Sequence, residues 1–124
     1  MAAPNIVGVT TIVGLTTGVN VTTTPTVFLT NSSDSGQVLK VNSIIVSNVD
    51  GTNAANVFVK LHQQAAGAGT SISLAHEISV AADSTLVLMD KASSIYIEEN
   101  KSLVSYASAN SDLDIVCSFE RISA

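Results

Sequence analysis

The adjacent carboxylates Glu98 and Glu99 are the first residues in this sequence that could do chemistry, either as a general acid–base pair or as metal ligands. They follow Ile95, Tyr96 and Ile97, which alternate as they would on a half-buried strand. Neighbouring residues on an extended chain point to opposite faces, so the two carboxylates would not act together on one substrate. We therefore interpret them as solvated acidic residues beside the turn of a tight hairpin.

The histidines and the cysteine are the next candidates. His62 and His76 fall on different predicted strands, and neither has a second His or Cys at the spacing of a metal site. His76 lies in the apolar phase of its strand, which indicates a hydrogen-bonded core or interface side chain. Cys117 stands between Ile115 and Phe119 in an inner phase, so we expect a buried and unreactive thiol. A Cys–His dyad has no motif to support it.

Oxygen ligands occur together near the end of the chain. Asp112 and Asp114 share one strand face, and with Asn110 they could offer oxygens to Ca²⁺; the bland alternative is two solvated carboxylates. The loop AAGAG (65–69) lacks the lysine and the helix of a phosphate cradle, and we interpret it as a flexible loop. Since no nucleophile, base and orienting group can be assembled, we expect a non-enzymatic protein without a cofactor or a metal.

Charge and composition exclude further classes. The 124 residues hold five Lys and Arg against ten Asp and Glu, for a net charge of −5. Five scattered cations cannot form the basic face that nucleic acid requires, so we expect no nucleic-acid partner. No apolar run approaches the roughly 18 residues of a membrane helix, so we expect no membrane partner.

Period-two alternation, broken by turn residues every 8 to 12 positions, indicates the elements that position these side chains. It predicts one all-β domain over 1–124, an antiparallel β-sandwich of about eight strands without significant helix, for which jelly-roll connectivity is one option. Segment 38–49 is apolar on both faces and should be a central strand. The expected strands lie near 5–15, 19–29, 37–48, 56–63, 71–80, 84–89, 94–98, 102–108 and 112–122.

The first 33 residues contain no Asp, Glu, Lys, Arg or His. Native proteins usually protect exposed strand edges with charge, so we expect a neutral, Val- and Thr-rich segment to be buried in the protein or in an interface. One interpretation makes it two interior strands of the sandwich. The other, favoured because Gly8, Gly14 and Gly18 are poor in interior strands, makes residues 1–18 an N-terminal arm or intersubunit strand. Its candidate assembly interface is Val7, Val9, Thr11, Val13 and Leu15.

Three later segments resemble small virion structural proteins of tailed bacteriophages, especially marine and cyanobacterial phages. They are VNSIIVSNVDGTNAANVFVKLH (41–62), ISVAADSTLVLMDKASSIYIEENKSLVSYASAN (78–110) and DLDIVCSFERIS (112–123). The resemblance lies in the pattern of turns and strands and includes no catalytic motif. It implies a β-sandwich of the decoration, neck or tail type, located in the virion.

The resemblance and the uncharged start lead to one expected function. We expect a capsid decoration (cement) protein that binds and stabilises the head shell, with the major capsid protein or other virion subunits as partners, and a homo-oligomer. The alternatives are a neck or tail component, such as a connector or fibre-attachment subunit, and a receptor- or carbohydrate-binding module. The last is weakened by the absence of Trp, which leaves Tyr96 and Tyr106 as stacking platforms.

Overall fold

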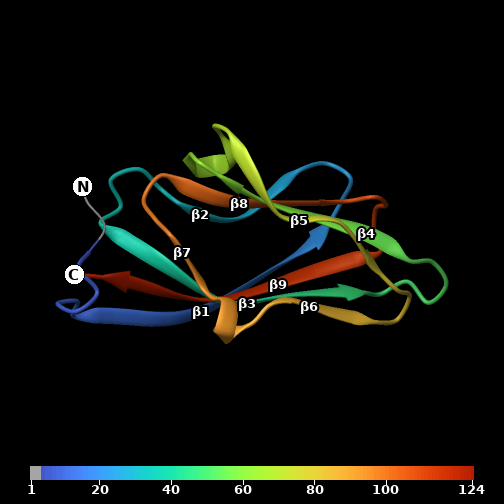
Figure 1. Cartoon of the computed structure of the whole chain (residues 1–124), viewed down its shortest axis with the longest axis horizontal. Helices are drawn as coiled ribbons and strands as arrows, with labels where there is room; N and C mark the ends of the chain where they lie inside the picture. The colour runs from blue at the N-terminus through green and yellow to red at the C-terminus, as the bar shows by residue number, and fades with distance from the viewer. Residues whose placement is uncertain (1–3) are drawn as a thin grey trace.

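Two antiparallel sheets pack face to face in the computed structural model, which describes residues 4–124 (Figure 1). The all-β sandwich expected from the sequence is confirmed. One sheet has the order β1-β9-β3-β6, with β7 also paired to β3, and the other has the order β2-β8-β4-β5. The elements are β1 (Thr11–Val21), β2 (Thr26–Asn31), β3 (Gln37–Asn48), β4 (Ala55–His62), the 3-10 turn η1 (Ala65–Gly67), β5 (Ser71–Val80), β6 (Thr85–Met89), the 3-10 turn η2 (Lys91–Ser93), β7 (Ile95–Ile97), β8 (Lys101–Ala107) and β9 (Leu113–Ser123).

The strands pair in a nested series from the ends of the chain inward. β1 pairs with β9, β2 with β8, β3 with β6, and β4 with β5, and every pair is antiparallel. Successive pairs alternate between the two sheets, as if one long hairpin had been rolled up. This is jelly-roll connectivity, to which β7 adds one short strand.

β9 illustrates why the sequence forms this sandwich. Leu113, Ile115, Cys117 and Phe119 are buried, whereas the residues between them are half-buried or exposed. Each large apolar side chain buried in this way is worth about 1.5–3 kcal/mol relative to an exposed one. The inner faces of both sheets therefore hold the layers together. Further members of this core include Val41, Ile44, Val46, Val57, Val59, Ile97 and Leu103.

The start of the chain differs from the expected strands 5–15 and 19–29. A turn precedes the first strand, because Asn5 accepts hydrogen bonds from the backbone N–H groups of Val7 (3.1 Å, to the side chain) and Gly8 (3.0 Å, to the carbonyl). Strand β1 then begins at Thr11 and continues through Gly14 and Gly18 to Val21. Both glycines lie at exposed positions of an edge strand, where a missing side chain costs little packing.

The tight hairpin expected around Glu98 and Glu99 is wrong. β7 pairs with β3 in one sheet and β8 pairs with β2 and β4 in the other, so residues 98–100 cross between the layers. Asn100 fixes this corner with a φ of 60°, and its N–H donates to the carbonyl of Asn31 (2.8 Å). Glu98 is exposed, as expected for a solvated residue, but both carboxylate oxygens of Glu99 are buried. Turn residues in a sequence indicate a reversal but not the sheet that the next strand joins.

The glycine-rich loop that follows β4 is tied down rather than flexible. The backbone N–H groups of Ala65, Ala66 and Gly67 donate to side-chain oxygens of Asn100 (3.1 Å), Thr30 (3.0 Å) and Ser102 (2.9 Å), respectively. These acceptors belong to the β7–β8 corner, β2 and β8. The loop therefore lies across the outer side of one sheet.

Two buried asparagines join the corners of the sandwich. The side-chain amide of Asn31 donates to the carbonyl of Ile97 (3.0 Å), and that of Asn48 donates to the carbonyls of Asn53 (2.9 Å) and Val80 (2.9 Å). Buried polar groups are tolerated where they are hydrogen-bonded, and the bonds to Ile97 and Val80 connect segments that are distant in sequence. They hold the ends of the two layers in register.

Candidate functional site

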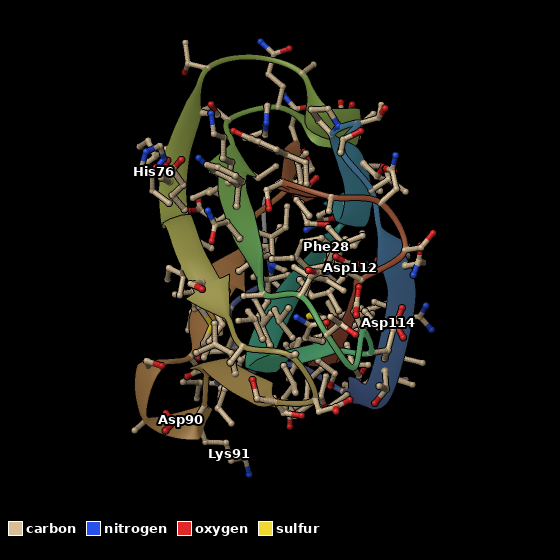
Figure 2. The ribbon with its side chains drawn as sticks, turned by 90° about the vertical axis from the view of Figure 1, so that its right-hand side faces the viewer. Phe28, His76, Asp90, Lys91, Asp112 and Asp114 are labelled. Atoms are coloured by element: carbon tan, nitrogen blue, oxygen red, sulfur yellow. The ribbon has the colours of Figure 1, made fainter. Side chains whose placement is uncertain are left out.

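The three residues that could have offered oxygens to Ca²⁺ have separate partners. Asp114 accepts a hydrogen bond from the side-chain amide of Asn20 (2.8 Å), and Asn110 accepts one from the backbone N–H of Thr23 (2.9 Å). Figure 2 shows Asp112 and Asp114 on the side of the molecule where β1 lies. Within residues 4–124, no group of three or more His, Cys, Asp or Glu side chains is arranged to hold a metal ion.

Asp112 instead forms a carboxyl pair with Asp50 from the loop after β3. The backbone N–H groups of Thr52 (2.7 Å) and Asn53 (3.2 Å) donate to Asp50, and these bonds hold the pKa of Asp50 below its usual value. Desolvation and the neighbouring charge of Asp50 raise the pKa of Asp112. The backbone therefore favours the ionised form of Asp50, whereas its neighbour Asp112 is protonated more readily than an isolated Asp.

Cys117 and His76 lie in opposite environments. Cys117 is fully buried between the sheets, as expected from the sequence, and burial raises the pKa of its thiol to about 12. His76 is exposed on β5, so it is not a core residue, and its alternative role at an interface stays a prediction (Figure 2). The phase of β5 changes near His76 because the strand has a bulge there, which alternation alone does not reveal. A Cys–His dyad would have to join the core to an outer surface.

An aromatic row crosses the outer face of the β2-β8-β4-β5 sheet. The rings of Phe58 and Tyr106 stack with centroids 4.5 Å apart and planes 6° apart. His76 meets Phe58 edge-on at 5.5 Å, and the Lys60 ammonium lies 5.7 Å from the centroid of the Tyr106 ring. Sugars stack on free ring faces, but neighbours in the row already cover faces of Phe58 and Tyr106. Of the two expected platforms, Tyr96 on β7 remains exposed.

Besides the three-residue β7, four described strands lie at sheet edges, and three of these four are poorly suited to pair with another chain. β2 and β6 have six and five residues, and the pairing of each is interrupted by a register shift. β5 has ten residues, but it has two register shifts and carries Glu77 at a φ of 55°. Bulges, short length and charge are the ordinary protections of an edge strand.

The fourth edge strand, β1, has none of these protections. Its eleven residues pair with β9 in continuous register from Thr11 opposite Ser123 to Val21 opposite Leu113. It contains no charged residue, and no described strand pairs with its outer edge. Alternate backbone N–H and C=O groups along this edge therefore lack a sheet partner. The free edge of β1 is the candidate functional site.

The outer face beside this edge is apolar and hollowed. Ile12 is 59% exposed and Val116, on the neighbouring β9, is 41% exposed. Gly18 lies directly opposite Val116 and contributes no side chain. A shallow hollow of about 300 Å³ results, lined by Gly18, Val19, Asn20, Asp114, Ile115 and Val116.

The residues expected to form the assembly interface do not share one strand. Val7 is 92% exposed in the turn before β1, Val9 is half-buried there, and Thr11 begins the strand. Val13 and Leu15 are half-buried on the inward face of β1, and Leu15 packs against the core. Residues 11–18 of the expected arm thus belong to the sandwich, and residues 1–3 lie outside the described part. A role of this segment in assembly stays a prediction, and the backbone edge is its better-placed component.

Comparisons with known proteins support the fold. No protein-family model matches the chain, and no curated protein matches it. Among solved structures it is similar to a protein described under "Bacillus endospore appendages form a novel family of disulfide-linked pili". The two share 14% identity over 91% of this chain and 87% of that chain, with a TM-score of 0.54. At this identity the likeness shows the fold alone.

Within residues 4–124, no helix has the length and apolar character needed to cross a membrane.

Proposed function

We propose that this chain is a non-enzymatic structural subunit that joins a larger particle through the free edge of β1. Its specific role is that of a capsid decoration protein, which binds the head shell of a tailed phage. The observation that carries the proposal is the contrast between this long, regular, uncharged edge and the three protected edges of the same sandwich. Strand addition at such an edge gives affinity through main-chain hydrogen bonds.

Charge distribution supports the same role. The first charged residue along the chain is Asp34, and the net charge of −5 comes from the remainder. An edge without charge can enter an interface without desolvating an ion, which would be costly. An acidic remainder suits the outer side of a particle, where it faces solvent and not packaged DNA.

The structural neighbour lends general support. That protein is described as part of disulfide-linked pili, so a sandwich of this fold is used there in an assembly of subunits. This chain has one cysteine, which is buried, and the assembly proposed for it therefore depends on strand pairing. A neck or tail component would use the same edge on a different part of the particle.

The test is co-sedimentation with particles that lack the protein. Thr16 is exposed on the outer face of β1, and Lys at this position would carry charge into the interface without disturbing the core. Ser79→Lys is the matched control, since Ser79 is an exposed hydroxyl residue on the protected edge strand β5. We expect the wild type and Ser79→Lys to sediment with particles and Thr16→Lys to remain in the supernatant.

Equal binding by all three proteins would overturn the role of β1. Immunogold labelling of intact particles then separates the head shell from the neck and the tail. Label on the neck or the tail would overturn the decoration role and leave a structural subunit of another part.

A further inference from the structure

We infer that the free edge of β1 pairs with β1 of a second copy of this chain, antiparallel, about a two-fold axis that passes beside Thr16. This inference rests on the proposed use of the β1 edge in assembly. It names a second copy of the chain as the subunit that pairs with this edge, so that the dimer, and not the single chain, joins the particle. The pairing would join the two β1-β9-β3-β6 sheets into one continuous sheet.

The sequence of β1 is nearly symmetric about Thr16. Reading outward from this residue, Leu15 and Thr17 come first, then glycine on both sides, then valine on both sides. In an antiparallel pair of identical strands centred on Thr16, each residue lies opposite the partner's residue at the same distance on the other side of Thr16. A two-fold interface uses the same patch on both subunits, so it requires such self-complementarity.

Valines meet on the inward face. Val13 would lie opposite the partner's Val19, and both positions are half-buried next to the edge. Leu15 would lie opposite the partner's Thr17. Because Leu15 and Val19 already pack against the core, these pairs would extend the apolar layer across the dimer.

Glycines meet on the outward face. Gly14 would lie opposite the partner's Gly18, with no side chains to clash or to force the strands apart. The exposed Ile12 would lie opposite the partner's Asn20. This explains why two glycines occur on the outer face of a long strand, where β-branched residues would otherwise be favoured.

The other edges of a second copy offer a poorer match. β6 has five residues, is irregular in register, and is followed at once by Asp90. β2 has six residues with a bulge, and β5 carries two register shifts and the charge of Glu77. Among the described edge strands, β1 alone presents eleven regular, uncharged residues, so self-pairing satisfies the most backbone groups.

Disulfide trapping tests the register directly. In the inferred pair, Thr16 is opposite the partner's Thr16, at a Cα separation of about 4.5–5.5 Å that a disulfide can span. Under mild oxidation Thr16→Cys should form a covalent dimer, and the native Cys117 should not interfere because it is buried. Thr11→Cys is the control: the exposed position 11 is five residues from the axis, so its two copies would be about 34 Å apart.

Solution mass completes the test. Sedimentation equilibrium should show a dimer for the wild type and for Ser79→Lys, whereas Thr16→Lys should weaken dimerisation at least about tenfold because two like charges would meet. Circular dichroism melts of the variants at low concentration should match the wild type. A wild-type monomer at all concentrations, a head-to-tail polymer, or equal trapping of both cysteine variants would overturn the two-fold pair.

The failure of this inference is distinguishable from failure of the proposed function. A monomeric protein whose binding to particles is abolished by Thr16→Lys would keep the β1 edge as the attachment site and exclude self-pairing. A dimer trapped through Thr16→Cys that does not bind particles would support self-pairing and exclude the β1 edge as the attachment site.

Discussion

β1 and β5 are edge strands of nearly equal length, eleven and ten residues, but they present opposite surfaces to a neighbour. Strand β1 pairs with β9 without a register shift, has no charged residue and contains Gly14 and Gly18. β5 changes register twice against β4 and turns Glu77 outward at a φ of 55°. One edge can accept another strand, and the other cannot do so without rebuilding its backbone.

The difference shows how a small sandwich can protect one edge strand and leave another available for a partner. A bulge and a charge protect β5 at the level of shape and of electrostatics, so it can remain exposed without aggregating. Strand β1 lacks both protections over eleven residues, which supports the proposal that a partner covers this edge.

Deleting residues 4–15 should have the largest effect, since it removes almost half of β1 together with Leu15, which packs against the core. We expect the free energy of unfolding to fall by about 3 kcal/mol or more, as for other large losses from a core. Deleting residues 4–10, which precede the strand, should cost no more than about 1 kcal/mol.

Urea unfolding measures both deletions, in the Thr16→Lys background so that self-association does not add to stability. A soluble, fully stable protein after deletion of 4–15 would show that β1 is an arm and not a strand of its own domain. In that case β1 would not offer a rigid edge for pairing with another strand.

Much of this fold was predictable from the alternation of apolar and polar residues. The segment 37–48 coincides with β3, and 71–80 coincides with β5, because inward positions in both strands are largely apolar. The crossing at residues 98–100 was not predictable, since a turn signal does not tell which sheet the next strand joins. Alternation also put His76 in the apolar phase of its strand, because a bulge shifts phase without changing composition.

The candidate site was partly predictable for a related reason. Missing charge in residues 1–33 is a property of the sequence, and the strand with the free, uncharged edge lies within this segment. Val13 and Leu15 face inward, so they could join an interface only by extending the apolar layer, and their role stays a prediction. The free groups belong to the backbone edge, and the sequence does not show on which side of a strand its neighbour lies.

Glu77→Val tests the protected edge. A β-branched residue at a φ of 55° is strained, so we expect the free energy of unfolding to fall by about 1–2 kcal/mol. Glu77→Gly is the control, since glycine adopts this conformation freely, and its stability should equal or exceed that of the wild type. Equal stability of the two variants in urea unfolding would show that the bulge yields easily and does not protect β5.

Cys117 reports whether β1 opens from its own sheet. It lies opposite Thr17 in the β1–β9 pair, and burial raises the pKa of its thiol to about 12. At pH 8 a thiol reagent should therefore label the native protein at least about 100-fold more slowly than the urea-unfolded protein. Deleting residues 4–15 should abolish much of this protection. Rapid labelling of the wild type would mean that β1 opens readily and that its edge is not a stable template.

The smallest effect concerns the carboxyl pair beyond the C-terminal end of β1. Asp112 has a raised pKa, so its ionised form is unfavourable in the native state, and Asp112→Asn should increase stability at pH 7. That gain should shrink as the pH falls through the native pKa of Asp112, because the wild-type carboxyl then becomes neutral too. Asp50 has a lowered pKa, so its ionised form stabilises the native state, and Asp50→Asn should decrease stability at pH 7. This loss should also disappear in acid, as the native Asp50 is protonated. Thermal melts of both variants between pH 7 and pH 3 measure the two differences. The same sign for both substitutions at pH 7 would show that the backbone bonds to Asp50 and its charge beside Asp112 do not set the two carboxyl groups apart.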